Sequence, residues 1–122
     1  MDITPLIKGD RKLLNSYGAG RFIVSGVEYG QSIVVTPGEV VPWANGLPFG
    51  EASFAFLDAL AAPVEILLIG TGKTITPLPP MLRQSLKDRG ISIDIMDTGA
   101  ACRTYNVLLS EERRVAAALA VI

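Results

Sequence analysis

Short runs of apolar and β-branched residues, separated by turn-forming residues, dominate the stretch between residues 21 and 36. These runs predict three strands, at residues 21–24, 27–29 and 32–36. Ser25-Gly26 and Gly30-Gln31 lie between them, and dipeptides of this kind are typical of tight turns. Because strands that follow one another so closely pair with their neighbours in antiparallel fashion, we expect a β meander here.

Two segments beside the meander contain too much proline and glycine for regular structure. Residues 1–20 are expected to be an irregular N-terminal segment, since one proline and three glycines interrupt them. Residues 37–50 contain three prolines and three glycines. They are expected to form a loop that holds Trp43 and at most one short strand, at residues 39–41.

The second half of the chain alternates between amphipathic and uniformly apolar segments. Phe54, Leu57 and Ala61 recur at helical spacing, whereas the run VEILLIG shows little alternation and suits a strand buried on both faces. The predicted elements are a helix at residues 51–62, a central strand at 65–69, a helix at 80–89, a second central strand at 91–96, and a helix with Asp97 or Thr98 as its N-cap. The two strands and the helix between them predict a right-handed parallel unit.

The C-terminal run RRVAAALAVI fits two structures. The helix propensity of alanine favours a helix, whereas an all-apolar terminal run also fits a strand in the middle of a sheet. The residue pattern alone leaves both possibilities open.

Composition limits the class of protein. The chain has 122 residues, which suits a single domain over 1–122, and 49% are hydrophobic, enough for a substantial core. A net charge of −1 and a pI of about 5.3 argue against a nucleic-acid-binding surface. No apolar run approaches the roughly 20 residues that span a bilayer, and no secretory signal is visible. We therefore expect a cytoplasmic protein without a nucleic-acid partner or an integral membrane segment.

The chain contains no histidine, and Cys102 is its single cysteine. The lack of histidine excludes imidazole bases and Ser-His-Asp triads. A zinc site would need carboxylates almost alone, and no disulfide can form within the chain. We expect no catalytic residue, no metal site and no cofactor. Cys102 is best interpreted as a buried thiol, because no histidine is present to activate it.

The segment GTGKT, at residues 70–74, looks like the end of a phosphate-binding loop. In a complete P-loop the first glycine would stand at the position of Leu67, inside the predicted strand. The lysine and threonine would also open a helix, but residues 76–80 include three prolines. The G-x-G-x-x-G pattern is incomplete as well. Nucleoside-triphosphate binding is therefore rejected.

Two glycine-bearing bends are expected at one edge of the sheet. Gly70-Thr71-Gly72 follows one predicted parallel strand, and Asp97-Thr98-Gly99 follows the other. Ligand crevices form at the carboxyl ends of such strands, and the helix that begins there offers free N–H donors. With Arg103 added, the crevice could bind a small anionic group or a carboxylate of a partner. In the alternative, the glycines only permit turns, Asp97 caps the helix, and Arg103 pairs with Asp97 or a carbonyl.

The segments LLIGTG and MDTGAACRTYNVLLSEERRVAAALAVI resemble a known family of small domains of unknown function. Its members include a mitochondrial respiratory complex I assembly factor and an adipogenesis-associated protein, and the family has no agreed biochemical activity. The resemblance covers most of the chain and is strongest at residues 67–72 and 96–122. It implies an α/β fold of three layers with a mixed central sheet, in which residues 114–121 form a strand antiparallel to its neighbours. It also implies a role through protein contacts, such as assembly of a respiratory complex.

Three single residues and one charged run are also candidates for function. Trp43 is either an anchor for a partner or a lid on the sheet. Tyr105 shares the apolar stripe of the last helix and is interpreted as core, whereas Asn106 lies off that stripe and is a candidate for the pocket. The run EERR is interpreted as a solvated turn, from which Arg114 could reach an acidic cap.

Three functions remain open. The first is a non-catalytic protein-binding or assembly-factor-like module that uses the Gly72 edge and the Trp43 loop. The second is a small anionic-ligand binder or an enzyme, with Asp97 as general base and Lys73 as a second titrating group. The third is a purely structural role for the shared motifs. The candidate ligand-binding or partner-binding residues are Gly70, Thr71, Gly72, Asp97, Thr98, Arg103, Asn106 and Trp43.

Overall fold

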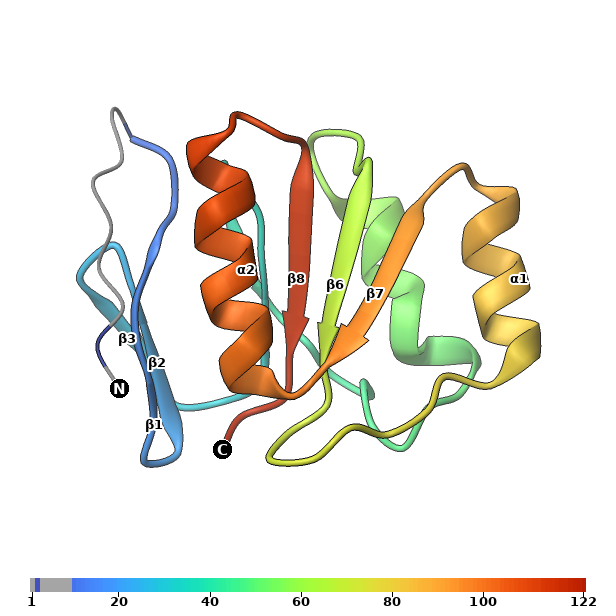
Figure 1. Cartoon of the computed structure of the whole chain (residues 1–122), viewed down its shortest axis with the longest axis horizontal. Coiled ribbons are helices and arrows are strands. Elements are labelled where there is room, and N and C mark those ends of the chain that lie inside the picture. Colours follow the sequence, from blue (N-terminus) through green and yellow to red (C-terminus); the bar gives the residue numbers. More distant parts are fainter. Residues whose placement is uncertain (1, 3–9) are drawn as a thin grey trace.

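The computed structural model of the chain describes residue 2 and residues 10–122. The strands form a three-stranded sheet with the order β1-β2-β3 and a five-stranded sheet with the order β5-β4-β8-β6-β7 (Figure 1). The elements are β1 (Leu14–Gly18), β2 (Arg21–Val24), β3 (Val27–Tyr29), β4 (Ile33–Val35), β5 (Val40–Pro42), η1 (Glu51–Ala59), β6 (Ile66–Gly70), α1 (Pro80–Asp88), β7 (Ser92–Met96), α2 (Thr98–Ser110) and β8 (Val115–Leu119). The expected α/β class, with a mixed sheet and an N-terminal antiparallel meander, is confirmed.

The three-stranded sheet is antiparallel and contains the first two predicted strands of the meander as β2 and β3. Ser25 and Gly26 connect them with φ angles of 46° and 83°, the backbone of a primed hairpin turn. The expectation that residues 1–20 are irregular is wrong for β1, which pairs with β2 and packs its apolar residues into the core. Residues 1 and 3–9 of that predicted segment lie outside the described residues.

The third predicted strand of the meander belongs to the other sheet, so the expectation of a three-stranded meander over residues 21–36 is wrong at its end. β4 pairs antiparallel with β5 on one side and with β8 on the other. All three residues of β4 are buried, as required of an interior strand with apolar layers on both faces. β5 corresponds to the short strand predicted at residues 39–41, displaced by one residue.

Strand β8 lies in the middle of the five-stranded sheet and is completely buried. The tail is therefore a strand, as the family resemblance implies. Its expected antiparallel arrangement holds toward β4 but is wrong toward β6, with which it pairs in parallel. β7 lies at the edge, so the expectation of a second central strand there is also wrong. Its alternation of exposed Ser92 and Asp94 with half-buried Ile93 and Ile95 is typical of a strand that is only partly covered.

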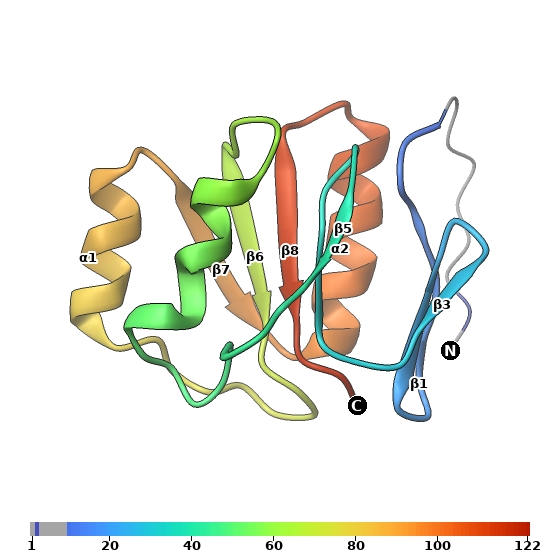
Figure 2. The ribbon, with the colours of Figure 1, turned by 180° about the vertical axis from the view of Figure 1, so that it is seen from behind.

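Helices cover both faces of the five-stranded sheet (Figures 1 and 2). On one face, α2 shares an apolar cluster with β4 and β8, and the three-stranded sheet contributes Leu14, Phe22 and Val24 to the same cluster. On the other face, η1 and α1 share a second cluster with β6 and β8. In the described part of the chain, no helix has the length and apolar character required to cross a lipid bilayer.

The helix predicted at residues 51–62 is shorter and tighter than expected. It is a 3₁₀ helix that ends at Ala59, and the backbone of Phe54 departs from helical angles. Beyond its end, the Ala61 N–H donates a hydrogen bond of 2.8 Å to Glu39 Oε2. A contact with a residue 22 positions away therefore replaces the helical bonds expected up to Pro63.

Trp43 is buried under the loop that carries it. The residue is 4% exposed, and its Nε1 donates a hydrogen bond of 2.7 Å to the Ser53 carbonyl. Gly46 lies directly against the indole, where a Cβ atom would be 2.4 Å from Trp43 Cε2. This placement corresponds to the second interpretation of Trp43, a lid on the sheet.

The contact between Gly46 and Trp43 gives a test of the fold. In Gly46→Ala the added methyl group overlaps the indole, and we expect the free energy of unfolding to fall by about 2 kcal/mol, as for an overpacked core. Urea denaturation followed by Trp43 fluorescence measures the change. Gly30→Ala is the matched control, because a Cβ atom there meets no atom within 4 Å. Equal stability of the two variants would contradict the described packing.

Candidate functional site

The two glycine-bearing bends lie on one rim of the five-stranded sheet, as predicted. The Thr71 N–H donates to the Met96 carbonyl at 3.0 Å, and the Thr98 N–H donates to the Gly72 carbonyl at 2.8 Å. The Gly72 N–H returns a hydrogen bond of 2.9 Å to Thr98 Oγ1. The bends are therefore bonded directly to each other.

Thr98 closes the rim further. Its side chain is fully buried, and its hydroxyl donates a hydrogen bond of 2.8 Å to the Ala120 carbonyl while it accepts the bond from Gly72. Gly70 leaves no room beside it, because a Cβ atom there would lie 2.9 Å from the Thr98 Cα atom. The polar groups of Gly72 and Thr98, which were expected to contact a ligand, are thus bonded to each other.

Asp97 and Arg103 have separate partners. Asp97 is the N-cap of α2, and its carboxylate accepts a hydrogen bond of 2.9 Å from the Ala100 N–H. Among the residues that the structure describes, Arg103 Nη1 donates a hydrogen bond of 2.7 Å to the Tyr17 hydroxyl oxygen and does not pair with Asp97 or a carbonyl. The Tyr17 ring in turn lies against Gly99, where a Cβ atom would be 2.9 Å from the hydroxyl. Arg103 therefore links α2 to strand β1.

Asn106 and Tyr105 also attach α2 to the N-terminal part of the chain. Asn106 is buried, although it is expected to lie off the apolar stripe, and its amide bonds both backbone groups of Leu14, at 2.9 and 2.8 Å. The Tyr105 hydroxyl donates to the Lys12 carbonyl at 2.6 Å, and burial raises the pKa of this phenol. The interpretation of Tyr105 as core is confirmed.

Cys102 is a buried free thiol, as predicted. Burial in the apolar cluster around α2 raises its pKa to about 12, even though Arg103 acts in the opposite direction. The sulfur is therefore protonated at neutral pH, and a protonated thiol is a poor nucleophile.

The exposed part of this rim is the segment at residues 73–77, which we call the rim loop. Thr71 Oγ1 holds it in place by donating to the Thr74 carbonyl and accepting from the Thr76 N–H, each at 2.8 Å. Between these two anchors, Ile75 is 59% exposed. The loop thus presents an apolar side chain on a fixed backbone.

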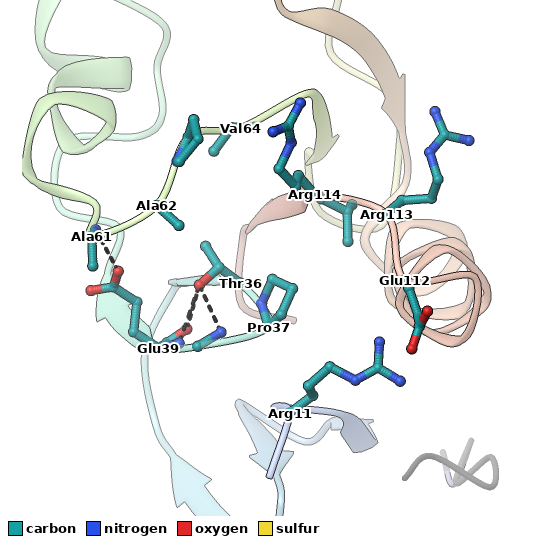
Figure 3. Close-up of a pocket in the computed structure, with 13 residues that line it drawn as sticks. Arg11, Thr36, Pro37, Glu39, Ala61, Ala62, Val64, Glu112, Arg113 and Arg114 are labelled. Carbon is teal, nitrogen blue, oxygen red and sulfur yellow. Dashed lines mark hydrogen bonds between the residues drawn. The ribbon is translucent and has the colours of Figure 1, made fainter. Parts of the chain in front are cut away.

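A cavity of about 470 Å³ opens at the other end of the sheet, beside the first residues of β6 and β8 (Figure 3). Its lining comes from four separate parts of the chain: Arg11, residues 36–39, residues 61–64 and residues 112–115. We call it the basic pocket, because three arginines and two glutamates line it.

The sequence does not identify the basic pocket. The EERR run is interpreted as a solvated turn, and no role is predicted for Arg11. The two consecutive arginines after α2 are the one local feature of the sequence that indicates a cationic site there. The other lining segments lie far apart along the chain, and only the strand pairing brings them together.

Comparison with known proteins gives a family. A family described as "Protein of unknown function (DUF498/DUF598)" matches residues 14–120. An uncharacterised protein of Rhodobacter capsulatus is 39% identical over 106 residues, which cover 87% of this chain and 82% of that protein. Assembly factor 3 of the NADH dehydrogenase (ubiquinone) 1 alpha subcomplex from mouse is 34% identical over 108 residues. These cover 87% of this chain but 58% of the mouse protein, so the match spans little more than half of that relative.

Solved structures show the same fold. A crystal structure of a protein from Bordetella parapertussis has a TM-score of 0.82 and 35% identity, and the match covers 93% of this chain and 98% of that one. The structure of a protein described as an outer membrane protein of Bartonella henselae has a TM-score of 0.78 and 38% identity, with 91% and 95% covered.

The hydrogen bonds of Thr98 give a prediction for the closed rim. Thr98→Val keeps the shape of the side chain but leaves the Gly72 N–H and the Ala120 carbonyl without this partner. We expect the free energy of unfolding to fall by about 2 kcal/mol, measured by urea denaturation. Thr104→Val is the control, because Thr104 is a half-exposed residue of the same helix. Equal losses in both variants would show that the Thr98 hydroxyl does not hold the rim.

The raised pKa of Cys102 gives a pH dependence. An unfolded chain ionises this thiol near the ordinary value of 9.0, whereas the folded protein keeps the proton up to about pH 12. Below pH 9 the thiol is protonated in both states, and its contribution to the free energy of unfolding is fully present. Above pH 9 the unfolded chain ionises first, so the free energy of unfolding falls, by about 1 kcal/mol at pH 10. Urea denaturation at pH 8 and pH 10 measures the loss. Cys102→Ala should lose less over the same range, and an equal loss would contradict the assignment to this thiol.

Proposed function

Since the chain belongs to the DUF498/DUF598 family, whose relatives include assembly factors of the NADH dehydrogenase 1 alpha subcomplex, we propose that it is a non-catalytic protein-binding module of the assembly-factor kind. The relationship to those assembly factors is the observation that carries the proposal. Its sequence match spans most of this chain. Assembly of a respiratory complex is the corresponding role by analogy.

The hydrogen bonds and burial of the candidate residues support a binding role without catalysis. Asp97, the proposed general base, is the N-cap of α2. The hydroxyls of Thr71 and Thr98 bond to the chain itself, and the Cys102 thiol is buried and protonated. These groups hold elements together, and none of them has the exposed, activated arrangement of a nucleophile or base.

The partner surface is proposed to be the rim loop. Apolar side chains on a pre-formed backbone bind partners at a low cost in conformational entropy. Ile75 meets this description, because Thr71 anchors the loop on both sides of it. Substitution of Trp43, the other candidate for partner binding, would not test binding alone, because it would also disturb the buried loop around Ser53.

A cytoplasmic location is part of the proposal. A related protein of Bartonella henselae is described as an outer membrane protein, so a membrane-bound location is the alternative that must be tested. Cell fractionation of the native host, with an antibody against the untagged chain, distinguishes a cytoplasmic pool from a membrane-bound one.

Substitution of Ile75 tests the partner surface. A carboxylate at this position introduces a charge that a partner must desolvate, so Ile75→Asp should reduce partner recovery at least about tenfold. The tagged full chain is expressed in its native host, cross-linked and purified. Mass spectrometry then gives the amount of each co-purified protein relative to the chain.

The matched control is Val107→Asp, because Val107 is 55% exposed and lies on helix α2, away from the rim loop. The proposal requires a protein that the wild type and the Val107 variant recover and the Ile75 variant loses, while all three unfold at similar temperatures. Identical partner lists for the two variants would place the binding surface elsewhere. No specific partner in any sample would contradict the binding role itself.

A further inference from the structure

The basic pocket is held open by hydrogen bonds between its own walls. The Lys12 N–H donates to the Pro37 carbonyl at 2.9 Å, which fixes the segment after Arg11 to the β4–β5 turn. Glu39 Oε2 accepts from the Ala61 N–H and joins this turn to the next wall. The Arg114 carbonyl accepts from the N–H groups of Glu65 and Ile66, at 2.8 and 3.2 Å. The pocket therefore exists before any ligand binds.

A large part of the pocket lining is apolar. It consists of the aliphatic groups of Pro37, Ala61, Ala62, Pro63, Val64 and Val115. The volume of about 470 Å³ lies within the range of roughly 300–1,000 Å³ that is typical of sites for small organic molecules. These features favour a ligand with an apolar body.

Arg114 is the available cation of the pocket. Among the described residues its guanidinium has no hydrogen-bond or ion-pair partner. Arg113 Nε is paired with Glu65 Oε1 at 3.0 Å, and Arg11 Nη1 donates to the Leu109 carbonyl at 2.7 Å. In Figure 3, Arg114 lies beside Val64, one of the apolar lining residues. A carboxylate bound there would meet a charged fork of N–H donors.

The two glutamates of the lining are already oriented toward other groups. Glu39 bonds the Ala61 N–H on the far side of the pocket from Arg114 (Figure 3). Glu112 points toward Arg11 in the same view. Glu112 has a φ of 59° because it directly follows the C-cap of α2, where the N–H groups of Glu112 and Arg113 bond the Leu109 and Leu108 carbonyls and end the helix.

We propose that the basic pocket binds a small organic monocarboxylate with an apolar body. The carboxylate is held by the Arg114 guanidinium, and the apolar body contacts the aliphatic lining groups of Pro37 and the segment 61–64. This site goes beyond the protein-binding role proposed above. It lies at the opposite end of the sheet from the rim loop and does not depend on it.

Octanoate is the probe for this site. Titration of the ¹⁵N-labelled full chain is followed through the amide signals in two-dimensional NMR. We expect saturable shifts at Gly38, Ala62 and Val115, which line the pocket, and none at the rim loop. Octylamine, a cation of the same length, should not produce these shifts. Arg114→Gln should weaken octanoate binding about tenfold.

Two controls separate carboxylate recognition from simple apolar binding. Arg83→Gln removes an exposed arginine of α1 that does not line the pocket, and it should leave the octanoate affinity unchanged. Octanol should bind at least several-fold more weakly than octanoate. Equal binding of octanol, an unchanged affinity in Arg114→Gln, or shifts confined to other parts of the chain would each overturn the proposal.

Discussion

The direct contact between the start of helix α2 and the end of strand β6 fixes the helix against the five-stranded sheet. Gly70 allows it, because any larger residue would meet the Cα atom of Thr98. At this distance the Thr98 hydroxyl bonds the Gly72 N–H and the Ala120 carbonyl at once. The ends of β6 and β8 and the first turn of α2 are thus joined in one buried junction, where an unpaired polar group would be costly.

The position of α2 then fixes the two features on either side of it. Along its length, Tyr105 and Asn106 bond the backbone of Lys12 and Leu14, so the three-stranded sheet is attached to the helix. At its C-terminal end, the turn into β8 places Arg114 against the start of β6. One helix therefore connects the closed rim to the open pocket.

Local sequence signals predict those elements whose structure depends on residues nearby in the chain. The apolar run of β6, the proline at the start of α1 and the N-cap Asp97 are of this kind. These signals do not predict the structure correctly where contacts with residues far along the chain determine it. β3 and β4 are both three-residue strands that follow one another closely, and only the pairing of β4 with β8 assigns them to different sheets. The end of η1 depends in the same way on Glu39.

The candidate site was also predictable only in part, and the mixed sheet explains why. Parallel strands bring their carboxyl ends to one edge, so the sequence correctly places the bends after β6 and β7 together. The orientation of the Thr71 and Thr98 hydroxyls, which closes that edge, is visible only in three dimensions. β4 runs antiparallel to β8, so its carboxyl end lies at the opposite edge, where Thr36 borders the basic pocket. In a mixed sheet, strands have their carboxyl ends at both edges, so the rule that ligands bind at carboxyl ends does not select one edge. Here side-chain hydrogen bonds close the edge at Thr71 and Thr98, and the cavity lies at the other edge.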